Sequence, residues 1–518
     1  SFYYPERAEK NCNDCHMPLV PSTDFAARVR DDSGIRKTMD HQYPSANTAL
    51  PHLMEKAGRM STEDAAAAIR AHREFNEGVM RLDLFALRED GELTGKLVAP
   101  LRPEVPALEP GKTYLLDAVI RTVKMGHLFT EGTSDSNQAW LDVTVTDGDR
   151  VIGRSGGMRE ADRAVDPWSH FVNSFVLDRD GNRINRRNAA NIFTSLYSNQ
   201  IPPGAADVVH YRLAVPADAR GPIAVTARLR FRKFDTEFMR LVTGDEAYVN
   251  DLPILELASD TVVFPVAGGE PVPAAAAPDV PTWERWNDYG IGLLHKRGRG
   301  ELRQAEEAFL RVEELGRPDG PMNLARVYLR EGRITGEAPA ALRRARDFDP
   351  PAREWTLLWL TGRANRRNGL LDDAILNFRQ ILSGGFRQAA GRGFDFSRDW
   401  RVRNELGATY YERSRRERGA ARRDARRKLL REAEGQFAAT LALDPENVAA
   451  HYGLKLVYRE LGEDAKSEHH AALHLRYKVD DNARDRAVTA ARRRYPAADR
   501  AAEAVVIHDL MRDGAWGR

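Results

Sequence analysis

The chain has 518 residues, enough for about two to four domains of ordinary size. Its positive and negative side chains nearly cancel, leaving a formal net charge of +2, so the bulk charge favours neither nucleic acid nor a membrane surface as a partner. The apolar share of 42% suits a folded protein, and no apolar run approaches the length that crosses a bilayer. We therefore expect no transmembrane segment.

The only two cysteines lie in the segment NCNDCHMPL, residues 11–19, where they form a Cys-x-x-Cys-His motif. A disulfide between them would close a very small ring and add little stability. A redox CxxC site is expected near a βαβ pattern, and a zinc site would need two further ligands, for which there is no second cysteine pair. The motif instead predicts a c-type haem, with thioethers from Cys12 and Cys15 and with His16 as the proximal iron ligand.

We expect residues 1–80 to form this haem-binding region, small, partly α-helical and partly irregular. A helix is predicted after Ser61, which resembles an N-cap with the acidic residue Asp64 at N3. The region has few large apolar residues, and a haem would supply the missing core of so small a unit. Residues 81–110 are predicted to be a connector.

Residues 111–266 alternate apolar and polar side chains in several short runs, such as TYLLDAVIRTV and IAVTARLRFRKF, with an Asp147-Gly148 turn between two of them. This pattern predicts an antiparallel β-sandwich domain. Residues 267–281 are rich in Pro and Ala and read as an interdomain linker.

From residue 282 to 518 the periodicity becomes helical and a pattern of aromatic, small and Pro residues recurs. It is typical of tetratricopeptide repeats and is seen at Trp286, Gly290, Ala305, Phe309, Pro318, Leu406, Gly407, Tyr410, Ala433, Phe437 and Pro445. We expect a C-terminal α-solenoid of four or five imperfect repeats, in which small residues let paired helices approach. Such repeats present grooves to partner proteins.

These segments together resemble bacterial multihaem cytochromes c that join a CxxCH region, a β-domain and C-terminal tetratricopeptide repeats. The likeness rests on CNDCHMP followed by DHQYPSANTALP, on MGHLFTEG at residues 125–132, which is similar to a GHxFPTG stretch, and on HHAALHLRYKVDDNARDRAV and YPAADRAAEAVVIHDL near the end. Thr130 stands where proline is usual and Glu131 where threonine is usual. Relatives carry several CxxCH motifs, whereas this chain has one, so an upstream haem-bearing part could be missing before Ser1.

For the sixth iron ligand we predict His41, which lies in the segment that the resemblance covers and beside Asp40, whose carboxylate could orient the ring. Bis-histidine ligation would give a lower potential than a methionine ligand would. An exposed histidine near a turn is the alternative for His41, or a ligand to the haem of another chain. The competing ligands in the same region are His52, His72, Met39, Met54 and Met60.

Other candidate sites have a structural explanation that we favour. His127, in GHLFTEG, is expected to be a structural histidine bonded to backbone in a tight corner. His469, His470 and His474 fall on a predicted repeat helix, where the last two share a face. DRDGNRIN, residues 178–185, resembles a calcium loop but lacks its closing glutamate, and the basic stretch 413–432 reads as a solvated helix extension.

The motif and the resemblance imply a c-type cytochrome subunit for electron transfer, and we expect a carrier rather than an enzyme, since no catalytic constellation stands out. Covalent haem attachment implies export to the periplasm or the extracellular space, with the signal peptide not present in this chain. Expected partners are a redox protein or other haem-bearing chains, in a homo- or hetero-oligomer, with no nucleic acid. The alternatives are a haem redox enzyme of the nitrite or hydroxylamine type, and a protein that is mainly an assembly scaffold.

Overall fold

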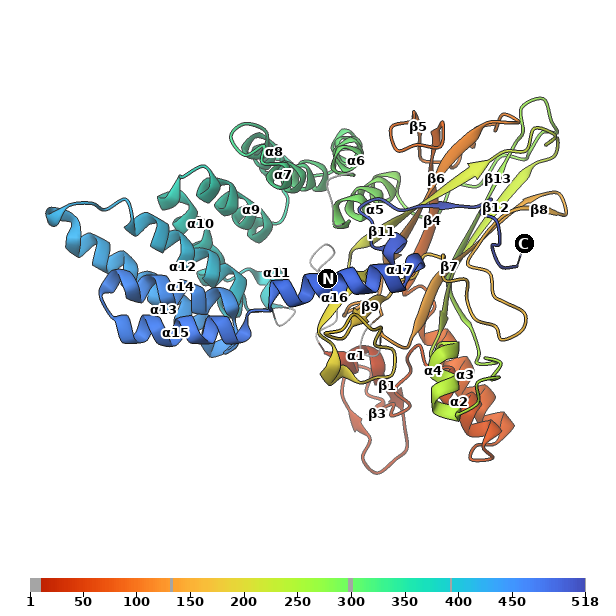
Figure 1. The fold of residues 1–518 in the computed structure, drawn as a ribbon, viewed down its shortest axis with the longest axis horizontal. Coiled ribbons are helices and arrows are strands. Elements are labelled where there is room, and N and C mark those ends of the chain that lie inside the picture. The colour runs from red at the N-terminus through yellow and green to blue at the C-terminus, as the bar shows by residue number, and fades with distance from the viewer. Residues whose placement is uncertain (1–10, 131–133, 297–300, 392–393, 518) are drawn as a thin grey trace. The chain divides into compact units, whose positions relative to one another are not determined.

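The computed structural model describes residues 11–130, 134–296, 301–391 and 394–517. They form two compact units (Figure 1). The first unit contains the described residues up to Glu301 together with those from Asn482 onward, and the second contains residues 302–481. Within the described ranges, no helix combines the length and the apolar character that a membrane span requires.

The N-terminal region of the first unit is a set of short elements. They are α1 (Cys12–His16), β1 (Leu19–Pro21), β2 (Arg28–Val29), β3 (Arg36–Met39), α2 (Ala49–Lys56) and α3 (Thr62–Phe75). The three strands form one antiparallel sheet in the order β1-β3-β2. Ser61 caps α3 as predicted, since its Oγ accepts the Asp64 N–H at 3.1 Å.

The larger sheets of the first unit follow. Their strands are β4 (Met80–Glu89), β5 (Leu97–Val98), β6 (Thr113–Thr122), β7 (Gln138–Asp147), β8 (Arg150–Ser155), β9 (Ser174–Leu177), β10 (Thr194–Ser198), β11 (Ala206–Ala214), β12 (Ile223–Arg232), β13 (Leu255–Phe264) and β14 (Ile507–Asp509), with α4 (Thr236–Thr243) between β12 and β13. One sheet has the order β14-β11-β6-β4-β5, a second β13-β12-β7-β8, and β9 pairs with β10.

The strand pairs of these sheets are antiparallel, as the alternating sequence predicts, except for the parallel pair of β11 and β14. The predicted turn is present: β7 and β8 are joined through Gly148, whose φ is +58°. The two larger sheets meet where β4 lies beside β13, since the Leu84 N–H donates to Asp260 Oδ2 at 2.7 Å. That these two sheets pack face to face as a β-sandwich stays a prediction.

Two parts of the structure differ from the predicted segmentation. The stretch 81–110, expected to be a connector, contains β4, a strand inside the sheet that pairs with β6 through Leu84 and Ala118. The end of the chain, expected to be repeat helices, instead returns to the first unit as α16 (Asp481–Arg494), α17 (Pro496–Ala501) and β14. Apolar contacts hold it there, because α16 and α17 pack on β9 and β10 in one buried cluster.

The helix α5 (Thr282–His295), expected to open the repeats, also belongs to the first unit and packs on β6 and β11. Charged side chains make much of this contact. Arg81 in β4 donates to Glu284 at 2.9 Å and also contacts Asp288, while Arg285 Nε donates to Asp83 at 2.7 Å. Because α5 covers them, β6 and β11 are buried on both faces rather than on alternate residues.

His210 in β11 lies at the centre of this charged layer and is fully buried. Its Nδ1 is 2.5 Å from Asp117 Oδ1 and its Nε2 is 2.6 Å from Glu301 Oε1, so both ring nitrogens donate and the ring is an imidazolium. Burial by itself lowers the pKa of His210, but the two carboxylates outweigh that effect and raise it to about 9.

This cluster predicts a pH dependence of stability. The pKa of His210 is near 6.5 in an unfolded chain and about 9 in the fold, so its contribution is complete below pH 6.5 and is lost as the pH rises through 9. We expect the free energy of unfolding of the first unit, measured by urea titration, to fall across this window by up to roughly 1 kcal/mol per pH unit. His210→Gln should be less stable at pH 6 and lose this slope. A slope that persists in the variant would assign it to other groups.

The second unit is helical. Its helices are α6 (Leu302–Glu314), α7 (Asp319–Glu331), α8 (Glu337–Asp347), α9 (Glu354–Arg367), α10 (Leu371–Ser383), α11 (Arg387–Ala390), α12 (Trp400–Ser414), α13 (Arg423–Leu443), α14 (Val448–Leu461) and α15 (Asp464–Tyr477). Apart from the short α11, each contacts the next along the chain, which is the connectivity of a helical repeat array. The basic stretch before and within α13 is mostly exposed, as expected of a solvated extension.

Glycines and phenylalanines of the repeat pattern meet between these helices. A Cβ on Gly407 in α12 would lie 3.0 Å from the ring of Phe437 in α13, and one on Gly362 in α9 would lie 2.7 Å from Phe378 in α10. Phe437 is buried in a cluster that includes Leu406, Tyr410 and Leu454. The pattern therefore marks the close helix contacts that the sequence predicts.

Phe437→Ala should destabilise the second unit strongly. Removing a buried phenylalanine ring from a packed contact costs about 3–5 kcal/mol. Urea unfolding monitored by circular dichroism would measure the loss. Leu475→Ala on α15 is the matched control, because Leu475 is 73% exposed and should change stability little. Equal effects of the two substitutions would contradict the packing described.

Candidate haem site

The motif Cys-x-x-Cys-His forms the single-turn helix α1. Asn11 precedes it, and the Asp14 carboxylate accepts the Asn11 backbone N–H at 3.1 Å, which fixes the start of the turn. Residues three apart lie on one side of a helix, so Cys12 and Cys15 share a face, and both are exposed. The helix thus presents two accessible thiols beside the following histidine.

His16 is oriented by the loop that follows β3. Its Nδ1 lies 2.8 Å from the carbonyl oxygen of Pro44, which can only accept, so Nδ1 carries the proton and Nε2 carries the lone pair. The ring of Tyr43 stacks on His16, with centroids 4.7 Å apart and planes 8° apart. Tyr43 has a φ of +49°, an uncommon conformation that this turn requires. A histidine held by a carbonyl in this way is prepared to bind a metal.

The same loop is fixed from its other side by α3. The Ser45 N–H donates to His72 Nδ1 at 3.0 Å, so His72 is neutral with its proton on Nε2. Burial lowers the pKa of His72, which agrees with a neutral ring. His72, a competing sixth ligand, is therefore used as a hydrogen-bond acceptor. Another competitor, His52, has its Nε2 3.6 Å from Asp251 Oδ2 in the β-domain.

The apolar side chains of the N-terminal region fit a large apolar cofactor. Among the described residues 11–75, the buried apolar side chains are Ala27, Ala49 and Ala65 with two prolines, Pro44 and Pro51. The larger apolar side chains are not buried: Leu53, Ile69 and Phe75 are among those that are partly buried, and the exposed ones are Leu19, Phe25, Val29, Ile35, Tyr43, Leu50 and Met54. A haem macrocycle is the kind of group that such a region folds around. The thiols, the imidazole and this apolar surface together fit a haem c.

His127 lies beside His16. The two rings are nearly parallel, 11° apart, with centroids separated by 6.3 Å. Besides Tyr43 and His127, the described ring that contacts His16 is that of Phe75, at 5.1 Å. His127 is exposed, and its Nδ1 is 3.1 Å from the carbonyl oxygen of Leu128. The expected backbone contact is present, but proximity to His16 was not expected from the sequence.

His41 is exposed. The neighbouring carboxylate of Asp40, expected to orient its ring, accepts the Gln42 N–H at 2.9 Å. His41 as the sixth ligand stays a prediction.

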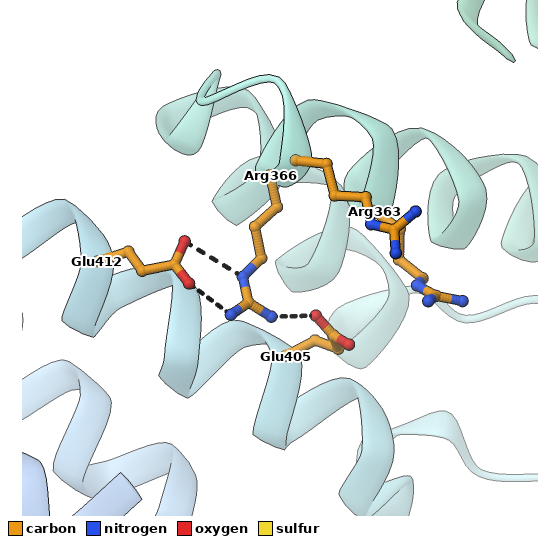
Figure 2. Close-up of a pocket in the computed structure, with 5 residues that line it drawn as sticks. Arg363, Arg366, Glu405 and Glu412 are labelled. Atoms are coloured by element: carbon orange, nitrogen blue, oxygen red, sulfur yellow. Dashed lines mark hydrogen bonds and ion pairs between the residues drawn. The ribbon is translucent and has the colours of Figure 1, made fainter. Parts of the chain in front are cut away.

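A cavity of about 320 Å³ in the second unit is lined by Arg363, Arg366, Arg367, Glu405 and Glu412 (Figure 2). Figure 2 shows Arg366 between the two glutamates: it donates to Glu412 at 2.6 Å and also contacts Glu405. These pairs join α9 to α12. The cavity is thus explained by an ion-pair network between repeat helices.

The other candidate sites are occupied by internal contacts. In the second unit, His470 Nδ1 is 2.9 Å from His451 Nδ1, and His474 Nδ1 is 3.1 Å from the Val448 carbonyl, so both histidines pack α15 on α14. Burial lowers the pKa of His470 to about 4. In the segment 178–185, Asp178 accepts the N–H groups of Asp180 and Asn182, which makes a polar turn. No cluster of three metal-ligating His, Cys, Asp or Glu side chains occurs among the residues described.

No family model and no curated protein matches this chain. Solved structures similar to parts of it include MamA from Desulfovibrio magneticus RS-1, at 13% identity over 38% of this chain and 94% of that chain, with a TM-score of 0.29. Another is a penta-haem cytochrome c552 from Thermochromatium tepidum, at 13% identity over 50% of this chain and 48% of that chain, with a TM-score of 0.28. TM-scores this low define neither the fold nor the function of the chain.

Proposed function

We propose that this chain is an exported c-type cytochrome subunit that transfers electrons through one covalently bound haem. The observation that carries the proposal is the Cys-x-x-Cys-His helix with His16 held by the Pro44 carbonyl. Cys12 and Cys15 are the residues that would hold the cofactor through thioethers, and His16 would present Nε2 to the iron. When bound, a haem supplies one-electron redox chemistry.

The protein side chains set the conditions for that chemistry. The Pro44 carbonyl fixes the tautomer of His16 and raises the basicity of its other nitrogen, which favours the ferric state. Tyr43 covers one face of the ring and Phe75 lies 5.1 Å from it, so both restrict its rotation. Export follows from the proposed cofactor, because this attachment takes place outside the bacterial cytoplasm.

The helical unit supports a role in assembly. Its consecutive helices, with glycine and phenylalanine at the close contacts, have the organisation of tetratricopeptide repeats, which bind partner proteins. We propose that it positions this chain against a redox partner or against other haem-bearing chains. A purified chain that stays monomeric and does not bind a candidate redox partner in sedimentation experiments would argue against this role.

Covalent haem attachment is the direct test. The chain expressed with a c-type haem attachment system should gain the mass of one haem and give a positive pyridine haemochrome assay. The Cys12→Ala, Cys15→Ala double variant should lose covalent haem, because both thioethers are gone. His469→Ala, on an exposed position of α15, should retain it. An apoprotein mass for the unaltered chain would overturn the proposal.

The spin state of the haem and its binding of small ligands, measured on the same protein, distinguish an electron carrier from a haem enzyme. A carrier with two axial histidines should be low-spin in both oxidation states, and carbon monoxide, cyanide and nitrite should leave its spectrum unchanged, because no coordination position is open. Rapid binding of these ligands to the untreated protein would favour the haem enzyme instead.

A further inference from the structure

His16 has a neighbour whose geometry suits the opposite face of an iron. In a metal–imidazole bond the nitrogen lies about 2 Å from the metal, and the ring centre lies about 1 Å beyond, so two imidazoles on opposite faces have centroids about 6 Å apart. The rings of His16 and His127 are 6.3 Å apart and nearly parallel. The Tyr43 ring, in direct contact with His16, is closer, at 4.7 Å.

We propose that His127 is the second axial ligand of the haem that His16 binds, an inference that rests on the proposed function. The two histidines have the same kind of hydrogen-bond partner at Nδ1. Each has Nδ1 near a backbone carbonyl, Pro44 at 2.8 Å for His16 and Leu128 at 3.1 Å for His127. A carbonyl at Nδ1 selects the tautomer whose Nε2 can bind a metal.

The segment that carries His127 is held firmly by the β-domain. Two residues further on, Phe129 exchanges two backbone hydrogen bonds with Ile201, at 3.0 and 2.8 Å, and the side chain of Phe129 is buried. The Gln200 amide donates to the Thr130 carbonyl. His127 and Leu128 are exposed while Phe129 and Thr130 are buried, so the segment displays the His127 ring at the surface.

His41 is the alternative ligand, and its surroundings differ. It is exposed, as His127 is, but its neighbour Asp40 is engaged by the Gln42 N–H in a local turn. The described rings around His16 are those of Tyr43, Phe75 and His127. The geometry therefore favours His127 over His41.

The test compares three histidine-to-alanine variants of the full haem-loaded chain. His127→Ala should lose the low-spin ferric spectrum, bind carbon monoxide in the ferrous form and have a higher midpoint potential, because a nitrogen ligand that favours ferric iron is removed. Added imidazole should restore the low-spin spectrum, which a merely structural role of His127 would not predict. His41→Ala should stay low-spin. His469→Ala, in the second unit, is the neutral control.

Each outcome of this test either supports or overturns the assignment of His127 as the second ligand. A low-spin spectrum of His127→Ala without added imidazole, or conversion to high-spin in His41→Ala, overturns the assignment of His127. If His127→Ala cannot be purified, His127→Met serves in its place: it should remain six-coordinate with a raised potential, and an unchanged potential overturns the inference. An unaltered chain without covalent haem overturns the proposed function as well, whereas covalent haem with an unaffected His127→Ala spectrum overturns this inference alone.

Discussion

The described part of the N-terminal region, residues 11–75, buries no large apolar side chain completely. Its buried apolar side chains within residues 11–75 are alanines and prolines, and burial of such small groups stabilises a fold far less than burial of Leu or Phe does. The region therefore depends on its surroundings. Ala49 of α2 packs into a cluster of the β-domain with Phe234, Phe238, Met239 and Leu252. The remaining requirement for apolar contact explains why a large cofactor suits this region.

The β-domain provides the rigid support, and charged side chains fix its geometry. Asp117 and Arg121 of β6 are both tied to the layer under α5: Asp117 contacts His210 and Tyr289, and Arg121 Nε is 3.3 Å from Asp288. Buried ion pairs add little net stability, but they accept few alternative arrangements. β6 ends at Thr122, and the segment that carries His127 follows it in the chain.

The sequence predicted those features of the fold that are set by short local sequence patterns. The Ser61 cap, the Gly148 turn and the Gly407–Phe437 contact are all readable because neighbours in sequence or a repeated spacing define them. It did not predict that α5 packs on a sheet, because its buried Glu284 and Asp288 look like solvent-facing residues until Arg81 is seen opposite them. Likewise, the GHLFTEG segment marked His127 as unusual, but only the tertiary fold brings it to His16.

The proposed ligand pair, His16 of the N-terminal region and His127 of the β-domain, would have a consequence for stability. Thioethers at Cys12 and Cys15 would keep the cofactor on α1, so closure by a histidine of the β-domain becomes an intramolecular step with a high effective concentration. The free energy of that bond would then also fasten the N-terminal region to the β-domain, in the way that metal binding contributes to folding in small metalloproteins. On the proposed ligation, the weak apolar core of residues 11–75 and the position of His127 would have one physical explanation: an iron bound by both segments would replace contacts that the side chains of this region do not make.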